Sequence, residues 1–122
     1  MYKRQQYGLK IKLVIINNRW QGMVRQWQES FYDERYSSSD MSCGEPDFVK
    51  LADSFGVKGF LISERKQLQD EFKFALNYDG PVLINVLVRR GENCYPMVPP
   101  GKSNAQMAVS YTHLTLPTTP YV

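Results

Sequence analysis

The sequence predicts an α/β fold, a partial doubly wound and mainly parallel sheet of about three strands with flanking helices. Three apolar segments predict the strands, at about 11–16, 57–62 and 82–88. Segments with apolar residues at helical spacing alternate with them, and this alternation favours parallel strands joined by right-handed crossovers. Three strands make an incomplete layer of this kind. We therefore expect further strands upstream, and poor solubility of this chain alone.

The first predicted strand ends at two asparagines, Asn17 and Asn18. An apolar run closed by turn-forming residues is typical of a central strand of a parallel sheet, and ligands bind beyond the carboxyl ends of such strands. An amide oxygen at that position suits magnesium, which often bridges to phosphates. Gly22, a little further on, allows backbone to approach a ligand closely. Asn-Asn is equally typical of an ordinary turn, and the residues alone leave both interpretations open.

Three helices are predicted between and beside the strands. Val24, Trp27 and Phe31 fall at helical spacing and predict a short helix over 23–32, followed by a loop over 33–44. The same residues at helical spacing are typical of ordinary core packing.

A second helix is predicted to begin near Pro46, with Glu45 as its cap, and to end at Gly56. Its expected buried face is formed by Phe48, Leu51, Ala52 and Phe55.

Ser63 is predicted to cap a third helix, about 64–78, and 77–81 reads as a stop and turn. The expected core face of this helix consists of Leu68, Phe72, Ala75 and Leu76. The last strand, 82–88, is nearly all apolar, which predicts burial on both faces. After it the chain becomes irregular and Pro-rich through Lys102.

Composition excludes several classes of function. The 122 residues suffice for one domain, and no apolar run is long enough to span a bilayer. Lys3 and Arg4 supply two of the 15 basic residues, so the rest nearly balance the 12 acidic ones and leave no basic stripe for nucleic acid. Cys43 and Cys94 lack the paired spacing of a zinc or redox motif, as expected of reduced thiols in a bacterial cytoplasm or a plastid.

The two ends resemble translated sequencing-adapter remnants. We expect residues 1–5 to be a non-native leader and 108–122 a non-native tail, with 6–107 as the native body; a genuine flexible C-terminus is the alternative. The only histidine, His113, lies in the expected tail. The body then holds no Ser-His or Cys-His nucleophile.

A longer pattern begins at residues 15–29, Ile-Ile-Asn-Asn-Arg-Trp-Gln-Gly-Met-Val-Arg-Gln-Trp-Gln-Glu. Further matches follow in order at 31–32, 35–37, 46–52, 80–84 and 96–104. Together, roughly residues 8–107 resemble the C-terminal thiamine diphosphate-binding domain of the large, catalytic subunit of acetohydroxyacid synthase, also called acetolactate synthase. Collinear agreement over this length is more specific than any single motif.

The resemblance implies thiamine diphosphate and magnesium as cofactors, with FAD in the full-length enzyme. The family's cofactor motif begins with Gly-Asp-Gly, which is absent here, and ends with Asn-Asn. By position, Asn18 would bind magnesium through its side chain and Trp20 through its backbone carbonyl, while Asn17 would hold the turn. Gly22 and Met23 would lie beside the cofactor, and Trp27 would line a channel for the second substrate. Residues 22–36 and 96–103 match a mobile loop and an arm that close over the active site.

The implied reaction joins pyruvate, after its decarboxylation, to a second 2-oxo acid (pyruvate or 2-oxobutyrate) in branched-chain amino acid biosynthesis. The implied enzyme is a transferase of two-carbon units that forms homodimers or homotetramers, with a regulatory small subunit as a further partner. No catalytic residue is expected in this chain, because the family's glutamate lies in the N-terminal domain; the chain alone is expected to be inactive. The alternatives are another thiamine diphosphate enzyme, of the glyoxylate carboligase or pyruvate oxidase type, and a non-catalytic α/β interaction module.

Overall fold

The computed structural model describes residue 3 and residues 6–110, so most of the predicted leader and tail lies outside the described residues. The chain forms two compact units. The sheet unit comprises Met1–Trp20 and Asp40–Arg90, and the helix–arm unit comprises Gln21–Ser39 and Gly91–Val122.

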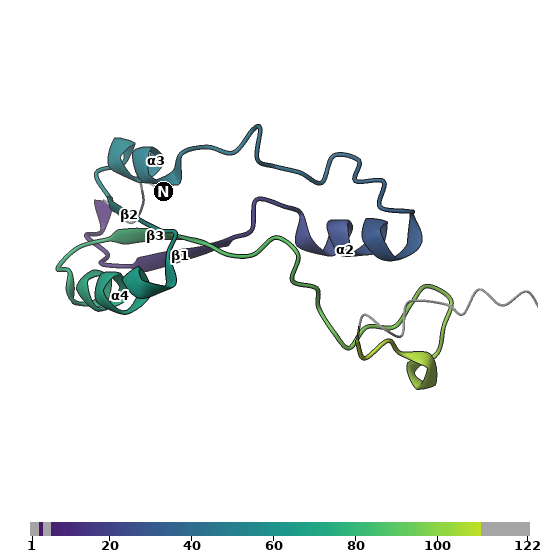
Figure 1. The fold of residues 1–122 in the computed structure, drawn as a ribbon. Helices are drawn as coiled ribbons and strands as arrows, with labels where there is room; N and C mark the ends of the chain where they lie inside the picture. The colour runs from purple at the N-terminus through teal and green to yellow at the C-terminus, as the bar shows by residue number, and fades with distance from the viewer. Residues whose placement is uncertain (1–2, 4–5, 111–122) are drawn as a thin grey trace, which may run out of the picture. The chain divides into compact units, whose positions relative to one another are not determined.

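The sheet unit contains a three-stranded parallel sheet, as the alternating pattern predicts (Figure 1). Its strands are β1 (Lys12–Asn17), β2 (Lys58–Ile62) and β3 (Val82–Leu87), in the order β1-β3-β2. The prediction that the first strand is central is wrong for the described residues. Strand β3 is central and buried from residue 82 to 86, whereas β1 pairs on one side only and leaves Ile16 68% exposed.

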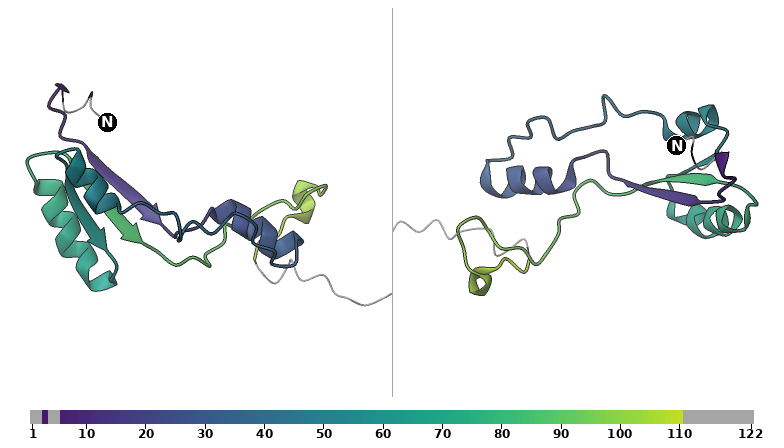
Figure 2. Two further views of the ribbon diagram at one scale, coloured as in Figure 1. Left: turned by 90° about the horizontal axis from the view of Figure 1, so that it is seen from above. Right: turned by 180° about the vertical axis from the view of Figure 1, so that it is seen from behind.

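Side chains of β3 alternate between two cores because successive residues of a strand point to opposite faces. One core lies under α4 (Leu68–Asn77) and contains Ile62, Ala75, Val82, Ile84 and Val86. The other lies under α3 (Phe48–Ser54) and contains Ala52, Val57 and Leu83. The two helices cover opposite faces of the sheet, as Figure 1 and the right-hand view of Figure 2 show.

Helix α3 is capped by Asp47 and not by Glu45. The Asp47 carboxylate accepts hydrogen bonds from the backbone N–H groups of Val49 and Lys50, both at 3.1 Å. Glu45 precedes the cap by two residues and is bound elsewhere. The helix ends at Ser54, and Gly56, the predicted stop, adopts φ +63° just beyond it. Leu51, expected on the buried face, is exposed.

Helix α4 begins later than predicted, after a 3₁₀ turn at Arg65–Gln67. Glu64 and Gln67 form a capping box there, so Ser63 is not the cap. Ala75 is fully buried and Phe72 packs against the same core. Leu68 and Leu76, also expected in the core, are exposed because the narrow sheet covers only one stripe of the helix.

The helix–arm unit is built from α2 (Gly22–Phe31) and the arm, residues 91–110. Helix α2 confirms the predicted helix to within one residue at each end. The arm is irregular except for a 3₁₀ turn at Asn104–Gln106, and Met97 and Ala108 exchange two backbone hydrogen bonds. Within the described residues, no helix has the length and apolar character needed to cross a membrane.

Candidate cofactor-binding site

The carboxyl ends of β1 and β3 open onto a cavity of about 310 Å³. Asn17 of β1 is level with Leu87 of β3 in the register of the sheet, so both strands end at the same edge. The cavity is lined by Asn17, Asn18, Arg19, Trp20, Ser42, Leu87, Val88 and Arg90. It therefore combines amide groups, a hydroxyl and two guanidinium groups at the position where open α/β sheets bind ligands.

Asn17 fixes the start of the turn that follows β1. Its side-chain N–H groups donate to Oε1 of Glu45 and to Oδ1 of Asn85, the latter at 3.1 Å. Its Oδ1 accepts the backbone N–H of Arg19 at 2.9 Å. The side chain is 9% exposed and makes three hydrogen bonds within the unit, so it is a structural part of the turn.

Asn85 is a residue that sequence reasoning missed. It stands in the buried central strand β3 and is 7% exposed. The register places it opposite Ile15, so its side chain lies diagonally across from Asn17 on the same face. A lone amide inside an apolar strand was the available signal, because a buried polar group requires a partner.

Arg19 adopts a left-handed conformation with φ +60°. Non-glycine residues enter this region at a cost and persist there only when the surroundings hold them. Here the Arg19 N–H is bound by Asn17 Oδ1 and its carbonyl accepts the N–H of Met41 at 2.9 Å. Its Nε lies 3.1 Å from Oε2 of Glu45. Both the backbone and the side chain of Arg19 are thus held in place within the turn.

Asn18 and Trp20 place two oxygen donors at this turn. The half-buried Asn18 uses Oδ1 to accept the N–H of Trp20 at 3.0 Å. Trp20 also pairs with Asp40 in an antiparallel bridge. On either side of this pair, the Met41 N–H donates to the Arg19 carbonyl and the Gln21 N–H donates to the Ser39 carbonyl. Trp20 and Asp40 therefore form a non-hydrogen-bonded pair, in which the N–H and C=O of each residue point away from the other. The Trp20 carbonyl is therefore directed to the side on which Asn18 Oδ1 receives the Trp20 N–H.

This donor set fits a hard cation such as magnesium. Amide and carbonyl oxygens are ligands that magnesium accepts, and an amide oxygen with one hydrogen bond retains a second lone pair. Within the described residues there is no group of three or more His, Cys, Asp or Glu side chains that could hold a metal. The oxygen atoms of Asn18 and Trp20 therefore fit part of a magnesium site.

Asp40 lies next to the cavity wall. Hydrogen bonds from the side chain and backbone of Ser42, with a smaller contribution from the charge of Arg90, hold the pKa of Asp40 below its usual value. Ser42 lines the cavity, and its N–H donates to Asp40 at 2.9 Å. Asp40 is thus an anion at neutral pH that orders the Ser42 side of the cavity.

The remaining predicted site residues lie on α2, in the helix–arm unit. Gly22 begins the helix and Met23 is half exposed. Trp27 packs edge-on against Phe31, with ring centroids 5.5 Å apart. Trp27 also lines a cavity of about 530 Å³ together with Val24, Gln28, Tyr32, Arg35 and Ser37. The structure thus brings Asn18 and Trp20 together at one cavity and gives Trp27 a different one.

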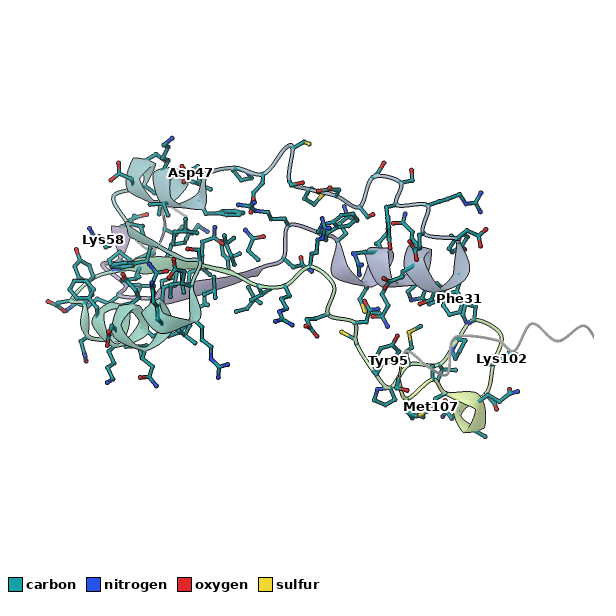
Figure 3. The ribbon with its side chains drawn as sticks, viewed as in Figure 1. Phe31, Asp47, Lys58, Tyr95, Lys102 and Met107 are labelled. Atoms are coloured by element: carbon teal, nitrogen blue, oxygen red, sulfur yellow. The ribbon has the colours of Figure 1, made fainter. Side chains whose placement is uncertain are left out.

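Side chains of helix α2 form sheltered hydrogen bonds with the arm. Gln26, 1% exposed, donates from Nε2 to the carbonyl of Cys94 at 2.9 Å and accepts the Cys94 N–H on Oε1 at 2.8 Å. Glu29 accepts from Arg25 at 3.1 Å and from Asn93 at 2.7 Å. The view with side chains in Figure 3 labels Phe31 at the end of α2 and Tyr95 on the arm. Sequence reasoning missed the contacts of Gln26 with Cys94 and of Glu29 with Asn93, because each joins residues more than 60 positions apart.

The comparisons with known proteins agree on one family. Residues 3–86 match the family model described as thiamine pyrophosphate enzyme, C-terminal TPP binding domain, where thiamine pyrophosphate is a synonym of thiamine diphosphate. The acetolactate synthase large subunit of Parasynechococcus marenigrum is 64% identical over 107 residues, which are 88% of this chain and 17% of that protein.

Two further relatives show how far the similarity extends. The acetolactate synthase large subunit of Pyropia yezoensis is 61% identical over 102 residues, 84% of this chain and 17% of that protein. The isozyme 2 large subunit of Escherichia coli is 44% identical over 105 residues, 86% of this chain and 19% of that protein. The chain thus spans less than a fifth of the length of these relatives. With an α/β sheet, a cavity at its carboxyl edge and this identity, the chain belongs to the acetolactate synthase large-subunit family of thiamine diphosphate enzymes, of which it carries part of the C-terminal cofactor-binding domain.

Proposed function

We propose that this chain is a segment of a thiamine diphosphate-dependent acetolactate synthase. The enzyme would decarboxylate pyruvate and join the two-carbon unit to a second 2-oxo acid, pyruvate or 2-oxobutyrate. The observation that carries the proposal is the 64% identity over 88% of the chain to an acetolactate synthase large subunit. The cavity at the end of β1 and β3 supports it, because it has the polar and cationic lining that a diphosphate requires.

In this proposal the Asn17–Trp20 turn binds the cofactor through magnesium. Asn18 Oδ1 and the Trp20 carbonyl are the two ligands that this chain would contribute. Arg19 and Arg90 would add positive charge near the diphosphate. When bound, thiamine diphosphate supplies the nucleophile and electron sink for breaking and forming the carbon–carbon bonds.

Helix α2 would contribute to water exclusion and substrate choice. Gly22 and Met23 are proposed to lie beside the cofactor, and Trp27 to line the path of the second 2-oxo acid. The aromatic pair of Trp27 and Phe31 and the cavity beside it support the role of Trp27, because an apolar wall with few polar groups is typical of substrate channels. Exclusion of water protects a reactive intermediate from protonation.

Other parts of the proposed enzyme lie outside this chain. The catalytic glutamate, the aspartate ligand of magnesium and most of the FAD site would belong to the remainder of the polypeptide or to a partner subunit. The assembly would be a homodimer or homotetramer with a regulatory small subunit, in a bacterial cytoplasm or a plastid. Residues 6–107 are proposed as the native body of the segment.

Two alternative functions have less support. A thiamine diphosphate enzyme of the glyoxylate carboligase or pyruvate oxidase type would share the fold and the Asn18 site. The names of the relatives compared above favour acetolactate synthase. A non-catalytic interaction module would not account for the polar and cationic cavity at the carboxyl ends of β1 and β3.

A chimaeric enzyme tests the proposal. The matching 107-residue segment of the Parasynechococcus marenigrum large subunit would be replaced by that of this chain, and acetolactate formation from pyruvate would be compared with the parent enzyme. We expect activity within about tenfold of the parent, which corresponds to a change of about 1.4 kcal/mol in the barrier. A folded chimaera that binds no thiamine diphosphate, or that binds it and forms no acetolactate, would contradict the proposal.

A further inference from the structure

We propose that Glu45 is a positioning residue for the cofactor-binding turn, Asn17–Trp20. This inference rests on the proposed function, since it concerns the same turn. Glu45 would set the conformation in which Asn18 and Trp20 present their oxygens, and it would do so without touching cofactor or metal. Nothing in its sequence position reveals this role, because Glu45 reads as a helix cap.

Glu45 contacts the turn through both carboxylate oxygens. Oε1 accepts a hydrogen bond from the Asn17 side chain, and Oε2 lies 3.1 Å from Nε of Arg19. The carboxylate is 15% exposed, so these contacts are sheltered from water and charge-assisted. One side chain thus holds the residue that begins the turn and the strained residue within it.

The capping role that could otherwise explain Glu45 belongs to another residue. Asp47 accepts the N–H groups of Val49 and Lys50, the second and third of α3, whereas Glu45 binds Asn17 and Arg19. The carboxylate of Glu45 therefore interacts with the turn and does not cap the helix. The carboxylate of Glu45 thus has a structural role in the turn, although α3 begins beyond it.

The turn has space to relax if Glu45 is removed. A cavity of about 250 Å³ lies on the α3 side of the turn, bounded by the turn itself and by residues that include Met41, Gly44, Glu45, Pro46 and Phe48. Without the carboxylate, Arg19 would lose its counter-charge and Asn17 one of its acceptors. A left-handed Arg19 with fewer restraints would then shift toward an ordinary conformation, because φ +60° is unfavourable for a side chain with a Cβ.

Electrostatics alone predicts the opposite effect on cofactor binding. Neutralising Glu45 makes the cavity more positive, since Arg19 and Arg90 both line it. A purely electrostatic role would therefore tighten binding of the anionic diphosphate in a Glu45→Gln variant. A positioning role would weaken binding and raise the magnesium requirement. The sign of the change distinguishes the two.

The test uses the chimaeric enzyme with Glu45→Ala, Glu45→Gln and Glu45→Asp. Thiamine diphosphate binding would be measured by titration calorimetry over a series of magnesium concentrations, and the apoenzyme melting temperature would be recorded in parallel. Glu71→Gln serves as the matched control, because Glu71 lies on α4 and lines neither cavity at the turn. Removing a residue that orients metal ligands typically costs 10–100-fold in metal affinity.

We expect Glu45→Ala to raise the half-saturating magnesium concentration at least tenfold, with a smaller rise in Glu45→Gln, which keeps an acceptor for Asn17. Glu45→Asp should resemble Glu45→Ala, because the shorter side chain cannot reach both partners. Unchanged or tighter binding in folded Glu45→Ala and Glu45→Gln would overturn the inference. Unfolding of both variants would also overturn it, because Glu45 would then serve the fold. If the unsubstituted chimaera fails to bind the cofactor, the proposed function fails instead.

Discussion

Replacing Gln26 with leucine should loosen the attachment of the arm to α2 by about 2 kcal/mol. Gln26 is almost fully buried and forms a pair of hydrogen bonds with the backbone of Cys94. Leucine would fill similar space but leave the Cys94 N–H and C=O without these partners. A buried group that loses its partner costs about 1–3 kcal/mol. Because Cys94 is an exposed residue, water can partly replace the lost bonds, and the lower end of that range applies to each group.

Hydrogen exchange gives a direct measure of this loss. The Cys94 amide is bound to Gln26 Oε1, so its exchange reports opening of the arm. A change of about 2 kcal/mol corresponds to roughly 30-fold faster exchange, since each 1.4 kcal/mol is a factor of ten. Gln69→Leu on α4 is the control and should leave the arm unchanged. If the Cys94 amide of Gln26→Leu exchanges within threefold of its original rate, these hydrogen bonds do not hold the arm on α2.

Three further predictions concern the fold and the site. In the chimaeric enzyme, Trp27→Leu should change the preference between pyruvate and 2-oxobutyrate as acceptors, measured by competition; unchanged selectivity would remove Trp27 from the channel. Lys12→Met should lower stability by about 1 kcal/mol in denaturant unfolding, because the Lys12 ammonium donates to two backbone carbonyls just after α4, each at 2.6 Å; an equal midpoint would contradict this. The lowered pKa of Asp40 means that its stabilising contribution is present above its unfolded-state value near 3.8 and is lost as pH falls through the folded-state value. Asp40→Asn should therefore reduce the acid dependence of unfolding below about pH 4, and an identical pH profile would count against the Ser42 interaction.

The sheet and its helices could be predicted because their signals are local. Apolar runs, helical spacing and Gly56 each act within a few residues, and the structure confirms the three predicted parallel strands and the three predicted α-helices. The position of β1 could not be predicted in the same way. An apolar strand reads alike at the centre and at the edge of a sheet, and the neighbours that decide between the two lie far away in sequence.

The misassigned caps have a different cause. Glu45 and Asp47 both precede α3, and a carboxylate at either position suits a helix N-terminus. Asp47 is the N-cap because its short side chain reaches the N–H groups of Val49 and Lys50. Glu45 binds Asn17 in the turn instead. Choosing between them required the contact of Glu45 with Asn17, which is 28 residues away.

The candidate site could be predicted only in part, because several contacts that support it join residues far apart in the sequence. Asn17 and Asn18 were recognisable from their place at the end of a strand. Asn85 and Glu45, which support Asn17, come from distant segments that only the folded sheet unit brings together. The left-handed Arg19 also gives no sequence signal, because arginine has no preference for that conformation.

The proposed role of Asn18 as a magnesium ligand is tested by magnesium-dependent thiamine diphosphate binding in an Asn18→Ala chimaera, with Asn77→Ala on α4 as the control. Asn18 lines the cavity and its side chain binds the Trp20 N–H within the same turn, so the substitution should spare the fold. We expect at least tenfold weaker binding, with partial recovery at high magnesium, and an apoenzyme melting temperature within a few degrees of the original. Unaltered magnesium dependence in a folded Asn18→Ala protein would contradict it.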